Sequence, residues 1–432
     1  MGFAAPQIDE NGLYRRIGWR LMPLLFISYV ISYIDRVNVG FAKLQMLDDL
    51  HFSAVVYGLG AGIFFVGFIL FEIPSNLLLY RLGARRWLAS LMVVWGALSM
   101  LMLFIRTPTS FYAFRFLLGM AESGFVPGAM YYLTQWYPAH RQGRVFSLLI
   151  TGASAGGIVV GPLSGWIMGA FQHAGGLRNW QWLFLLQGAP AVVMGLVLLN
   201  RLVETPQQAD WLTVPEKEHI ATLLAVPAKH QVRRGDVLAA FTTARVWLLG
   251  AALMAANLGI YAGVFWLPST IKAAGVSSFS TIGLISTIPY AGSALAMWAL
   301  GRSSDLRHER RWHCLIGMLI ASGGLLIQAW SGGASMIAVG GLVISISFFI
   351  GVTPLIWAQA GELIVGRAAA AGFAFMNVFA GSAGFLASYA MGAAQQAFGD
   401  TSGVSYVLAV VAVGGGLIFL AVRSGLPARQ PV

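Results

Sequence analysis

Four charged residues lie inside long apolar stretches of this sequence: Asp35, Arg36, Arg115 and Glu122. A charge at the centre of a lipid bilayer costs at least ~2.5–3.5 kcal/mol on insertion scales, so such residues are rare and usually face a bundle interior or a cavity. Arg115 and Glu122 are two helical turns apart and therefore project from one helix face, because two turns take ~7.2 residues. We expect the two acids and two bases to neutralise one another in one cavity.

These residue types suit the movement of an organic anion together with a proton. A guanidinium group offers a carboxylate two parallel hydrogen bonds in addition to its charge. A carboxylic acid in a partly desolvated site can hold a proton near neutral pH. If the proton and the anion share one network, protonating an acid frees an arginine for the anion. A permanent ion-pair lock between two helices is the alternative interpretation.

The chain that positions these residues has 432 residues, of which 58% are hydrophobic and 10% charged. Soluble domains carry roughly 25% charged residues, so the composition predicts an integral membrane protein. Basic residues at cytoplasmic membrane edges explain the net charge of +11 without a nucleic-acid partner. The single cysteine, Cys314, excludes an intrachain disulfide. The first apolar run lacks a cleavage site after the polar residues 1–17, so we expect an uncleaved helix.

Apolar stretches of about 20 residues, the length that crosses a bilayer, recur in two sets separated by a polar segment. They predict an all-α membrane protein with twelve transmembrane helices in two six-helix bundles. Residues 1–203 would form the N-terminal bundle, 204–243 a cytoplasmic linker and 244–432 the C-terminal bundle. The predicted spans are 18–41, 54–80, 86–105, 108–133, 145–171, 180–203, 246–271, 280–301, 313–330, 335–361, 367–394 and 404–423.

The basic residues predict the orientation of the chain. Most of the 27 Lys and Arg residues fall on one side of the predicted spans, and the positive-inside rule makes that side, with both termini, cytoplasmic. The outer loops contain only Lys43, Arg106, Arg178 and Lys272. In the linker, residues 213–216 (TVPE) match a capping box that opens a short surface helix. The linker is interpreted as a tether between the bundles, with a regulatory role as the alternative.

The two halves of the chain repeat. The second and eighth predicted spans are each followed by a basic loop that ends in a tryptophan, Trp87 or Trp312. Small residues, which let helices approach closely in lipid, recur every four positions in the fifth and eleventh spans. They are Gly157, Gly161, Gly165 and Gly169, then Gly384, Ser388 and Gly392.

The second half has no charged counterpart to Asp35 and Arg36. Its spans contain amide and aromatic side chains instead, which indicates a division of labour: charge and protons in the first half, recognition of hydroxyl groups or rings in the second. For each of these side chains, core packing or helix–helix bonding is the alternative. The candidates are Asn257, Tyr261, Trp266, Tyr290, Trp357, Gln359 and Asn377.

The remaining polar candidates have structural or gating interpretations. Glu72 lies in the inner part of the second span, where bonding to helix ends or loop arginines is favoured over a direct role in transport. The loop residues fit the positive-inside rule and could also gate by pairing across the bundles; they are Arg85, Arg86, Asp305, Arg310 and Arg311. No metal-ligand cluster, phosphate-binding loop or Ser/His/Asp arrangement stands out. We therefore expect no enzyme, no metal and no cofactor, with protons as the coupling ion.

Several motifs occur together along nearly the whole chain. They are YIDRVN at 33–38, EIPSN at 72–76, GARRW at 83–87, RFLLGMAESGFVPG at 115–128, NWQWLF at 179–184, FWLP at 265–268, GRSSD at 301–305 and RRWH at 310–313. This set resembles the anion:cation symporter family of the major facilitator superfamily, in which two six-helix halves repeat. It looks most like the bacterial permeases for tartrate, phthalate, hydroxyphenylacetate and sugar acids.

The resemblance implies proton-coupled uptake of a carboxylate by alternating access. By matching position, Asp35 and Glu122 would be the protonated acids, and Arg36 would bind the substrate carboxylate. Arg115 would tune Glu122. Asn377 matches a family asparagine, which suggests a substrate contact. The full set of substrate-binding candidates is Arg36, Tyr33, Asn377, Trp357 and Tyr261.

The sequence departs from the family pattern at Gln187, at 358–360 (AQA) and at Gly381. These departures lie in the second half of the chain or in the span that leads to it. They bear on which substrate is bound and leave the predicted class of protein unchanged. We expect a monomer in the inner (plasma) membrane, in contact with lipid and a small organic anion. An exchanger or facilitator without proton coupling, and a sensor that binds without transport, are the alternatives.

Overall fold

Helices make up all the regular structure in the described part of the chain. The computed structural model describes residues 8–172, 174–224, 243–364 and 369–422, and these ranges contain no strand. The later part of the predicted linker, the start of the eleventh predicted span and the last residue of the twelfth lie outside the described residues. The prediction of an all-α protein is confirmed for the described residues.

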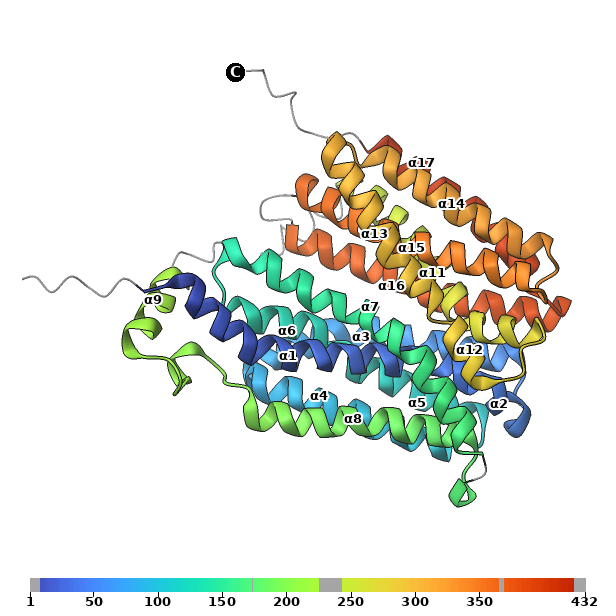
Figure 1. Cartoon of the computed structure of the whole chain (residues 1–432), viewed down its shortest axis with the longest axis horizontal. Coiled ribbons are helices and arrows are strands. Elements are labelled where there is room, and N and C mark those ends of the chain that lie inside the picture. The colour runs from blue at the N-terminus through green and yellow to red at the C-terminus, as the bar shows by residue number, and fades with distance from the viewer. Residues whose placement is uncertain (1–7, 173, 225–242, 365–368, 423–432) are drawn as a thin grey trace, which may run out of the picture.

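The first half of the chain forms one group of helices, coloured blue to green in Figure 1. In this group α1 packs on α7, α3 on α5, and α4 on α8. Polar caps fix two of the starts: Ser53 accepts a hydrogen bond from the Val56 N–H, and Thr107 and Ser110 form a reciprocal capping box. The helices are α1 (Glu10–Val37), α2 (Val39–Leu50), α3 (Ala54–Leu82), α4 (Ala84–Leu101), α5 (Pro108–Glu122), α6 (Phe125–Thr134), α7 (Ala139–Ala170) and α8 (Asn179–Arg201).

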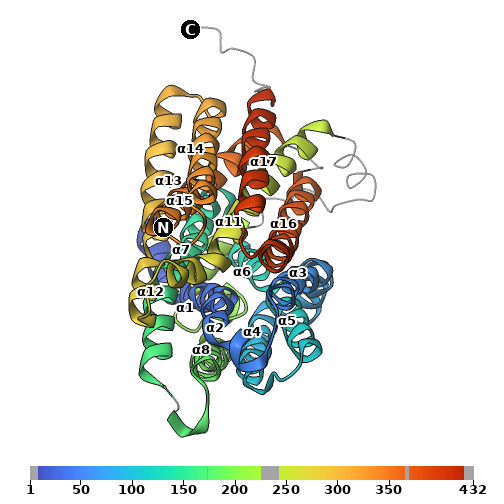
Figure 2. The same ribbon diagram turned by 90° about the vertical axis from the view of Figure 1, so that its right-hand side faces the viewer.

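The second half forms another group, in which α11 packs on α15, α16 and α17, and α14 on α15 and α17. Figures 1 and 2 show the two groups next to each other, with α2, α3 and α7 against α11, α16 and α12 respectively. The helices are α11 (Ala244–Ala273), α12 (Phe279–Ile285), α13 (Ile288–Arg307), α14 (Arg311–Trp330), α15 (Met336–Leu363), α16 (Ala369–Phe398) and α17 (Ser402–Ala421). The exact domain boundaries stay a prediction.

The described part of the linker is attached to the first group of helices. It contains α9 (Val214–Leu224), and Glu216 accepts a hydrogen bond from the Thr213 N–H at 2.9 Å, as the capping pattern predicts. Partial burial opposes ionisation of Glu216, but the Thr213 N–H and the Arg16 guanidinium outweigh it and hold the pKa of this carboxyl below its usual value. The Trp211 ring stacks on Trp136 with centroids 5.8 Å apart.

Eleven helical segments in the described ranges are long and apolar enough to cross a membrane. The remaining predicted span, 108–133, corresponds to α5 and α6, which are each too short alone. The helix breaks there at Ser123 and Gly124, because Pro127 has no N–H to bond the Ser123 carbonyl and its ring opposes that carbonyl. Gly124 also lies so close to Ser75 that a Cβ atom would overlap the serine hydroxyl. The count of twelve spans and the cytoplasmic position of the termini stay predictions.

Small residues form the contact between the two groups at one end of the molecule, where α2 and α12 lie (Figure 1). There Gly161 of α7 faces the backbone of Gly283 in α12, and Gly58 of α3 faces Ser388 and Gly392 of α16. At Gly58 an added Cβ atom would lie 2.5 Å from the Ser388 carbonyl oxygen, which no side chain tolerates. The small-residue faces that the sequence indicated therefore pack between the two groups. We call this the α2/α12 end, and the opposite end, where α9 lies, the α9 end.

Candidate functional site

An ion pair joins the last turn of α1 to the last residue of α5. Arg36 donates from Nε and Nη2 to Glu122 Oε2 at 3.2 and 3.0 Å, and Ser32 Oγ contacts the same oxygen at 3.4 Å. The Arg36 side chain is 12% exposed, whereas that of Glu122 is fully buried. The rings of Phe64 and Phe68 lie 5.6 and 5.1 Å from the Arg36 guanidinium. The pair therefore stands at the border between packed interior and accessible space.

Arg115 is fully buried and pairs with backbone instead of with an acid. Its Nε donates to the Gly60 carbonyl at 3.3 Å and its Nη2 to the Ala61 carbonyl at 3.5 Å, while Nη1 has no partner among the described residues. The Phe64 ring lies 4.7 Å from its guanidinium, so this one ring borders both arginines. Two helical turns separate Arg115 from Glu122, which brings its charge near Glu122 without an ion pair.

Asp35 turns away from the Arg36–Glu122 pair. Its Oδ1 accepts hydrogen bonds from Asn38 Nδ2, at 3.0 Å, and from the hydroxyl of Ser99 on α4. Consecutive residues on a helix project about 100° apart, so Asp35 faces α4 when Arg36 faces α5. The expectation that all four charges neutralise one another in one cavity is therefore wrong in detail. Of these four residues, only Arg36 and Glu122 form an ion pair with each other.

Each buried acid keeps one oxygen without a hydrogen-bond donor in the described structure. These oxygens are Oδ2 of Asp35 and Oε1 of Glu122, and both side chains are at most 1% exposed. A buried ionised oxygen without a donor is costly, and a proton on it removes that cost. The geometry thus offers two places where a proton can bind.

Tyrosines from both groups of helices surround the ion pair. The charge of Arg36 interacts electrostatically with three tyrosines, Tyr29, Tyr33 and Tyr261. The Tyr33 ring meets Tyr290 edge-on at 6.1 Å, and the Tyr261 ring lies 4.5 Å from Phe65. Of the substrate-binding candidates, Tyr33 and Tyr261 therefore lie beside the charged cluster.

The other two candidates from the second half make different contacts. Asn377 is exposed and donates from Nδ2 to Glu72 Oε1 at 2.8 Å, so its described bond joins α16 to α3. Glu72 was expected to bond a helix end or a loop arginine, and its side chain bonds this amide instead. Trp357 packs its ring 6.2 Å from that of Phe373.

The loop residues at the α9 end bond within their own group of helices. Arg85 donates to the Leu199 carbonyl at 2.7 Å, and its backbone N–H donates to Glu204 at 3.0 Å. Arg310 pairs with Glu362 and contacts Asp305 at 3.9 Å, and Arg311 donates from Nε to the Leu420 carbonyl at 2.7 Å. Arg86 is exposed. The described contacts of these residues do not pair the two groups in this conformation, so a gating role for them stays a prediction.

Sequence reasoning missed several residues that complete the site. Ser32 and Asn38 follow helical spacing, four residues before Arg36 and three after Asp35, so polar residues at those offsets in an apolar run were a usable signal. Ser99, Phe64 and Phe68 come from other helices, and only their packing reveals them. No group of three or more His, Cys, Asp or Glu residues in the described ranges could hold a metal ion.

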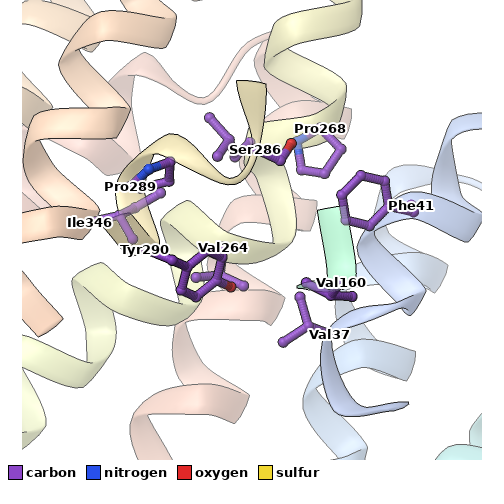
Figure 3. A pocket seen from close by; sticks show the side chains of 10 residues that line it. Val37, Phe41, Val160, Val264, Pro268, Ser286, Pro289, Tyr290 and Ile346 are labelled. Atoms are coloured by element: carbon purple, nitrogen blue, oxygen red, sulfur yellow. The ribbon is translucent and has the colours of Figure 1, made fainter. Parts of the chain in front are cut away.

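A small apolar cavity lies between α1, α2 and α7 on one side and α11, α12, α13 and α15 on the other (Figure 3). Its volume is about 10 Å³, at the lower limit for a single water molecule. Val37, Phe41, Val264, Pro268 and Tyr290 are among its lining residues. It is too small and too apolar to hold an organic anion in this conformation.

Buried charges inside a bundle of membrane-crossing helices, beside an interface between two helix groups, define a membrane transporter. The chain belongs to the Major Facilitator Superfamily, whose family profile matches residues 25–388. Since that family consists of membrane transporters, the protein is a multi-pass transporter and not an enzyme.

Several transporters from bacteria are similar to this chain over nearly its whole length. The chain is 42% identical over 405 residues to NicT of Pseudomonas putida, provisionally named a metabolite transport protein, with 92% of each chain covered. It is 37% identical to an Agrobacterium vitis protein provisionally named a tartrate transporter, covering 96% of this chain and 92% of the relative. It is 34% identical to the inner membrane transport protein RhmT of Escherichia coli, covering 94% of each.

Solved structures of other transporters share the fold. The inward open conformation of the xylose transporter XylE from E. coli has a TM-score of 0.74 at 12% identity, covering 93% of this chain and 96% of that one. An inward-facing, unoccupied bacterial homologue of the human lysosomal transporter Spinster has a TM-score of 0.73 at 17% identity, covering 95% of each. At these identities the likeness concerns the fold alone.

Proposed function

We propose that the protein takes up a small organic carboxylate together with a proton, by alternating access across the bacterial plasma membrane. The observation that carries the proposal is the Arg36–Glu122 ion pair, in which a partly exposed guanidinium holds a fully buried carboxylate. An arginine in this position can exchange its internal carboxylate partner for the carboxylate of a ligand, because both present the same pair of oxygens.

The proton and the anion are coupled through this exchange. Protonation of Glu122 removes its negative charge, and Oε1 can take the proton without displacing any bond among the described residues. The neutral acid no longer attracts Arg36 by opposite charge and accepts its hydrogen bonds through an uncharged oxygen, so the guanidinium is held less strongly. Arg36 becomes free to bind the ligand, so anion and proton bind together and leave together.

Asp35 supplies a second proton site in the same mechanism. Its Oδ1 is fixed by Ser99 and Asn38, and its Oδ2 has no donor in the described structure. It lies one residue before Arg36 on α1, so its charge adds to the potential at the site. The proton count per anion depends on whether both acids release their protons in each cycle.

The substrate class is a small carboxylate that carries hydroxyl groups or a ring: tartrate-, phthalate-, hydroxyphenylacetate- or sugar-acid-like. Tyrosine rings and hydroxyls border Arg36 from both groups of helices. The names of two of the relatives, which refer to tartrate and to metabolites, support an organic anion of this kind.

The described conformation corresponds to the inward-facing state of the cycle. Close backbone contacts shut the α2/α12 end, which the distribution of basic residues predicts to be the outer end.

The test is the pH outside proteoliposomes after addition of tartrate, phthalate, hydroxyphenylacetate or a sugar acid. The wild type is expected to alkalinise the outside with at least one compound. Glu122→Gln, which is neutral and of the same shape, should lose that signal while labelled anion still exchanges across the membrane. The matched control is Glu72→Gln, which makes the same change at the acid bonded to Asn377 and should keep the signal.

Two other outcomes of this experiment would each indicate a different function. Exchange of labelled anion without alkalinisation in the wild type would indicate an exchanger or facilitator. Binding of an anion that never crosses the membrane would indicate a sensor.

A further inference from the structure

Lys43 lies in a cage of aromatic rings at the α2/α12 end. Its side chain belongs to a residue that is only 9% exposed, and its Nζ lies 4.1 Å from the Trp266 ring centroid and 4.7 Å from that of Tyr57. The same atom donates to Ser269 Oγ at 3.2 Å. No carboxylate of the described residues pairs with it. A buried ammonium group without an acid is costly to keep, so a purely structural role explains it poorly.

The cage is assembled from both groups of helices. Tyr57 of α3 belongs to the same group as Lys43, whereas Trp266 and Ser269 belong to α11 in the other. Lys272 of α11 also crosses this contact, donating to the Leu44 carbonyl at 2.7 Å. Separation of α2 from α11 would therefore remove Trp266 and Ser269 from the ammonium group and leave it beside Tyr57.

Lys43 and Arg36 lie on one path along the molecule. Asn38, between α1 and α2, has right-handed helical angles (φ −55°, ψ −28°), so the chain remains nearly helical from one to the other. Seven residues of helix make about two turns and ~10 Å, which places both cations on one face. That face meets α3, where the Phe64 ring borders Arg36 and the Tyr57 ring borders Lys43, and at Lys43 it also meets Trp266 of α11.

The space between the two cations is closed in this conformation. Val37 and Phe41, which lie between them in the chain, line the apolar cavity of about 10 Å³ together with Val264 and Pro268 of α11 (Figure 3). No carboxylate fits there. An anion can move from Lys43 to Arg36 only when α2 and α11 have separated.

We propose that Lys43 is the outer capture residue for the anion, a binding position distinct from Arg36 and closer to the α2/α12 end. This inference rests on the proposed function. When this end opens, the ammonium group exchanges Trp266 and Ser269 for the incoming carboxylate, and a bound carboxylate keeps the two α11 residues from returning. The anion then moves inward to Arg36, and the cage closes again over Lys43. A ligand that binds only the open arrangement shifts the population toward it.

The first experiment measures the charge at the cage without needing the substrate. The only cysteine, Cys314, is buried, so Cys314→Ala with Ser269→Cys gives one reporter thiol next to Lys43. In proteoliposomes with the α2/α12 end outside, this thiol is labelled from outside with an anionic (sulfonatoethyl) or a cationic (trimethylammonioethyl) methanethiosulfonate. The readout is the ratio of the two labelling rates.

Lys43→Gln is expected to lower the ratio of anionic to cationic labelling roughly 20-fold, because a unit charge ~4–5 Å away in water contributes roughly 1 kcal/mol of opposite sign for each reagent. Lys43→Arg should keep the ratio. The control Arg106→Gln removes a charge from the predicted outer loops and should leave the ratio unchanged. An equal ratio with lysine or glutamine at 43, or no labelling from outside in any variant, would overturn the proposal.

The second experiment measures uptake at low and at saturating anion. In Lys43→Gln, uptake at low concentration should fall about tenfold, the loss should shrink at saturation, and Lys43→Arg should restore it. A loss that is equal at all concentrations, or that arginine does not restore, would show that Lys43 packs the interface and captures no anion. The wild type could also move no carboxylate while the labelling ratio still depends on Lys43. That result would show that the proposed function is wrong and that Lys43 nevertheless supplies a positive charge at this position.

Discussion

The two groups of helices bring unlike side chains to the space between them. The first buries Asp35, Arg36, Lys43, Arg115 and Glu122 wholly or nearly so. In the described part of the second, from α11 to α17, no Asp, Glu, Lys or Arg is buried. If the first group binds both the proton and the charged part of the anion, the second group can change its shape without disturbing the coupling of proton to anion. Substitutions in the two groups should therefore fail in different ways.

The largest effect is expected from Arg36→Gln. Loss of two charge-assisted hydrogen bonds, together worth about 3 kcal/mol, should weaken anion binding about 100-fold. Arg36→Lys keeps the charge and loses the paired geometry, so it should bind at an intermediate level. Isothermal titration of the purified protein with its anion measures both. Equal affinity in the glutamine variant would remove Arg36 from the site.

A smaller effect, on coupling and not on binding, is expected from Asp35→Asn. The neutral amide cannot carry a proton, so accumulation of labelled anion driven by a pH gradient should fall about tenfold, while exchange of anion for anion continues. Ser99→Ala, which removes a donor to Asp35 and leaves the acid, is the control and should keep gradient-driven uptake. Equal accumulation by Asp35→Asn and the wild type would leave Glu122 as the sole proton site.

In the second group, Tyr261→Phe tests recognition. One hydroxyl hydrogen bond contributes ~0.5–1.5 kcal/mol, so the KM for a hydroxylated anion should rise about fivefold. An anion without hydroxyl groups should be unaffected, and uptake should depend on external pH as in the wild type. An altered pH dependence would contradict the division between the two groups.

The smallest effect is expected from Asn377→Ala. Its amide nitrogen bonds Glu72 in the described conformation, so this donor must exchange its partner before it can contact the anion. We expect the KM to rise about two- to threefold, corresponding to roughly 0.5 kcal/mol. Uptake kinetics of Glu72→Gln, measured in parallel, separate loss of the substrate contact from loss of the bond between α3 and α16. A tenfold or larger rise would place Asn377 at the substrate in more than one conformation.

Much of the fold follows from the sequence because lipid imposes simple rules. Apolar length predicted the spanning helices, and four-residue spacing of small residues predicted faces that meet across the two groups. The division of span 108–133 was missed although Pro127, which interrupts helical hydrogen bonding four residues upstream, was a signal in the sequence. The packing of Gly124 against Ser75 of another helix could not be predicted.

The candidate site was less predictable than the fold. Helical spacing correctly placed Arg115 and Glu122 on one helix, α5. It could not show that Arg115 donates to the carbonyl groups of Gly60 and Ala61, or that Asp35 meets Ser99. Those partners depend on how α3 and α4 pack. Lys43 looked like an ordinary outer loop charge, because the aromatic rings around it come from positions distant in the chain.

The glycine crossings at the α2/α12 end, unlike the lysine contacts beside them, should be insensitive to ionic strength. The crossings of Gly161 with Gly283 and of Gly58 with Gly392 involve uncharged atoms at van der Waals distance. Dissolved ions do not screen such contacts, whereas exposed charges more than about 8 Å apart are largely screened at physiological salt. The α9 end carries Arg85, Arg86, Arg310 and Arg311 instead. Salt should thus weaken interactions among the exposed charges of the α9 end and leave the glycine crossings intact.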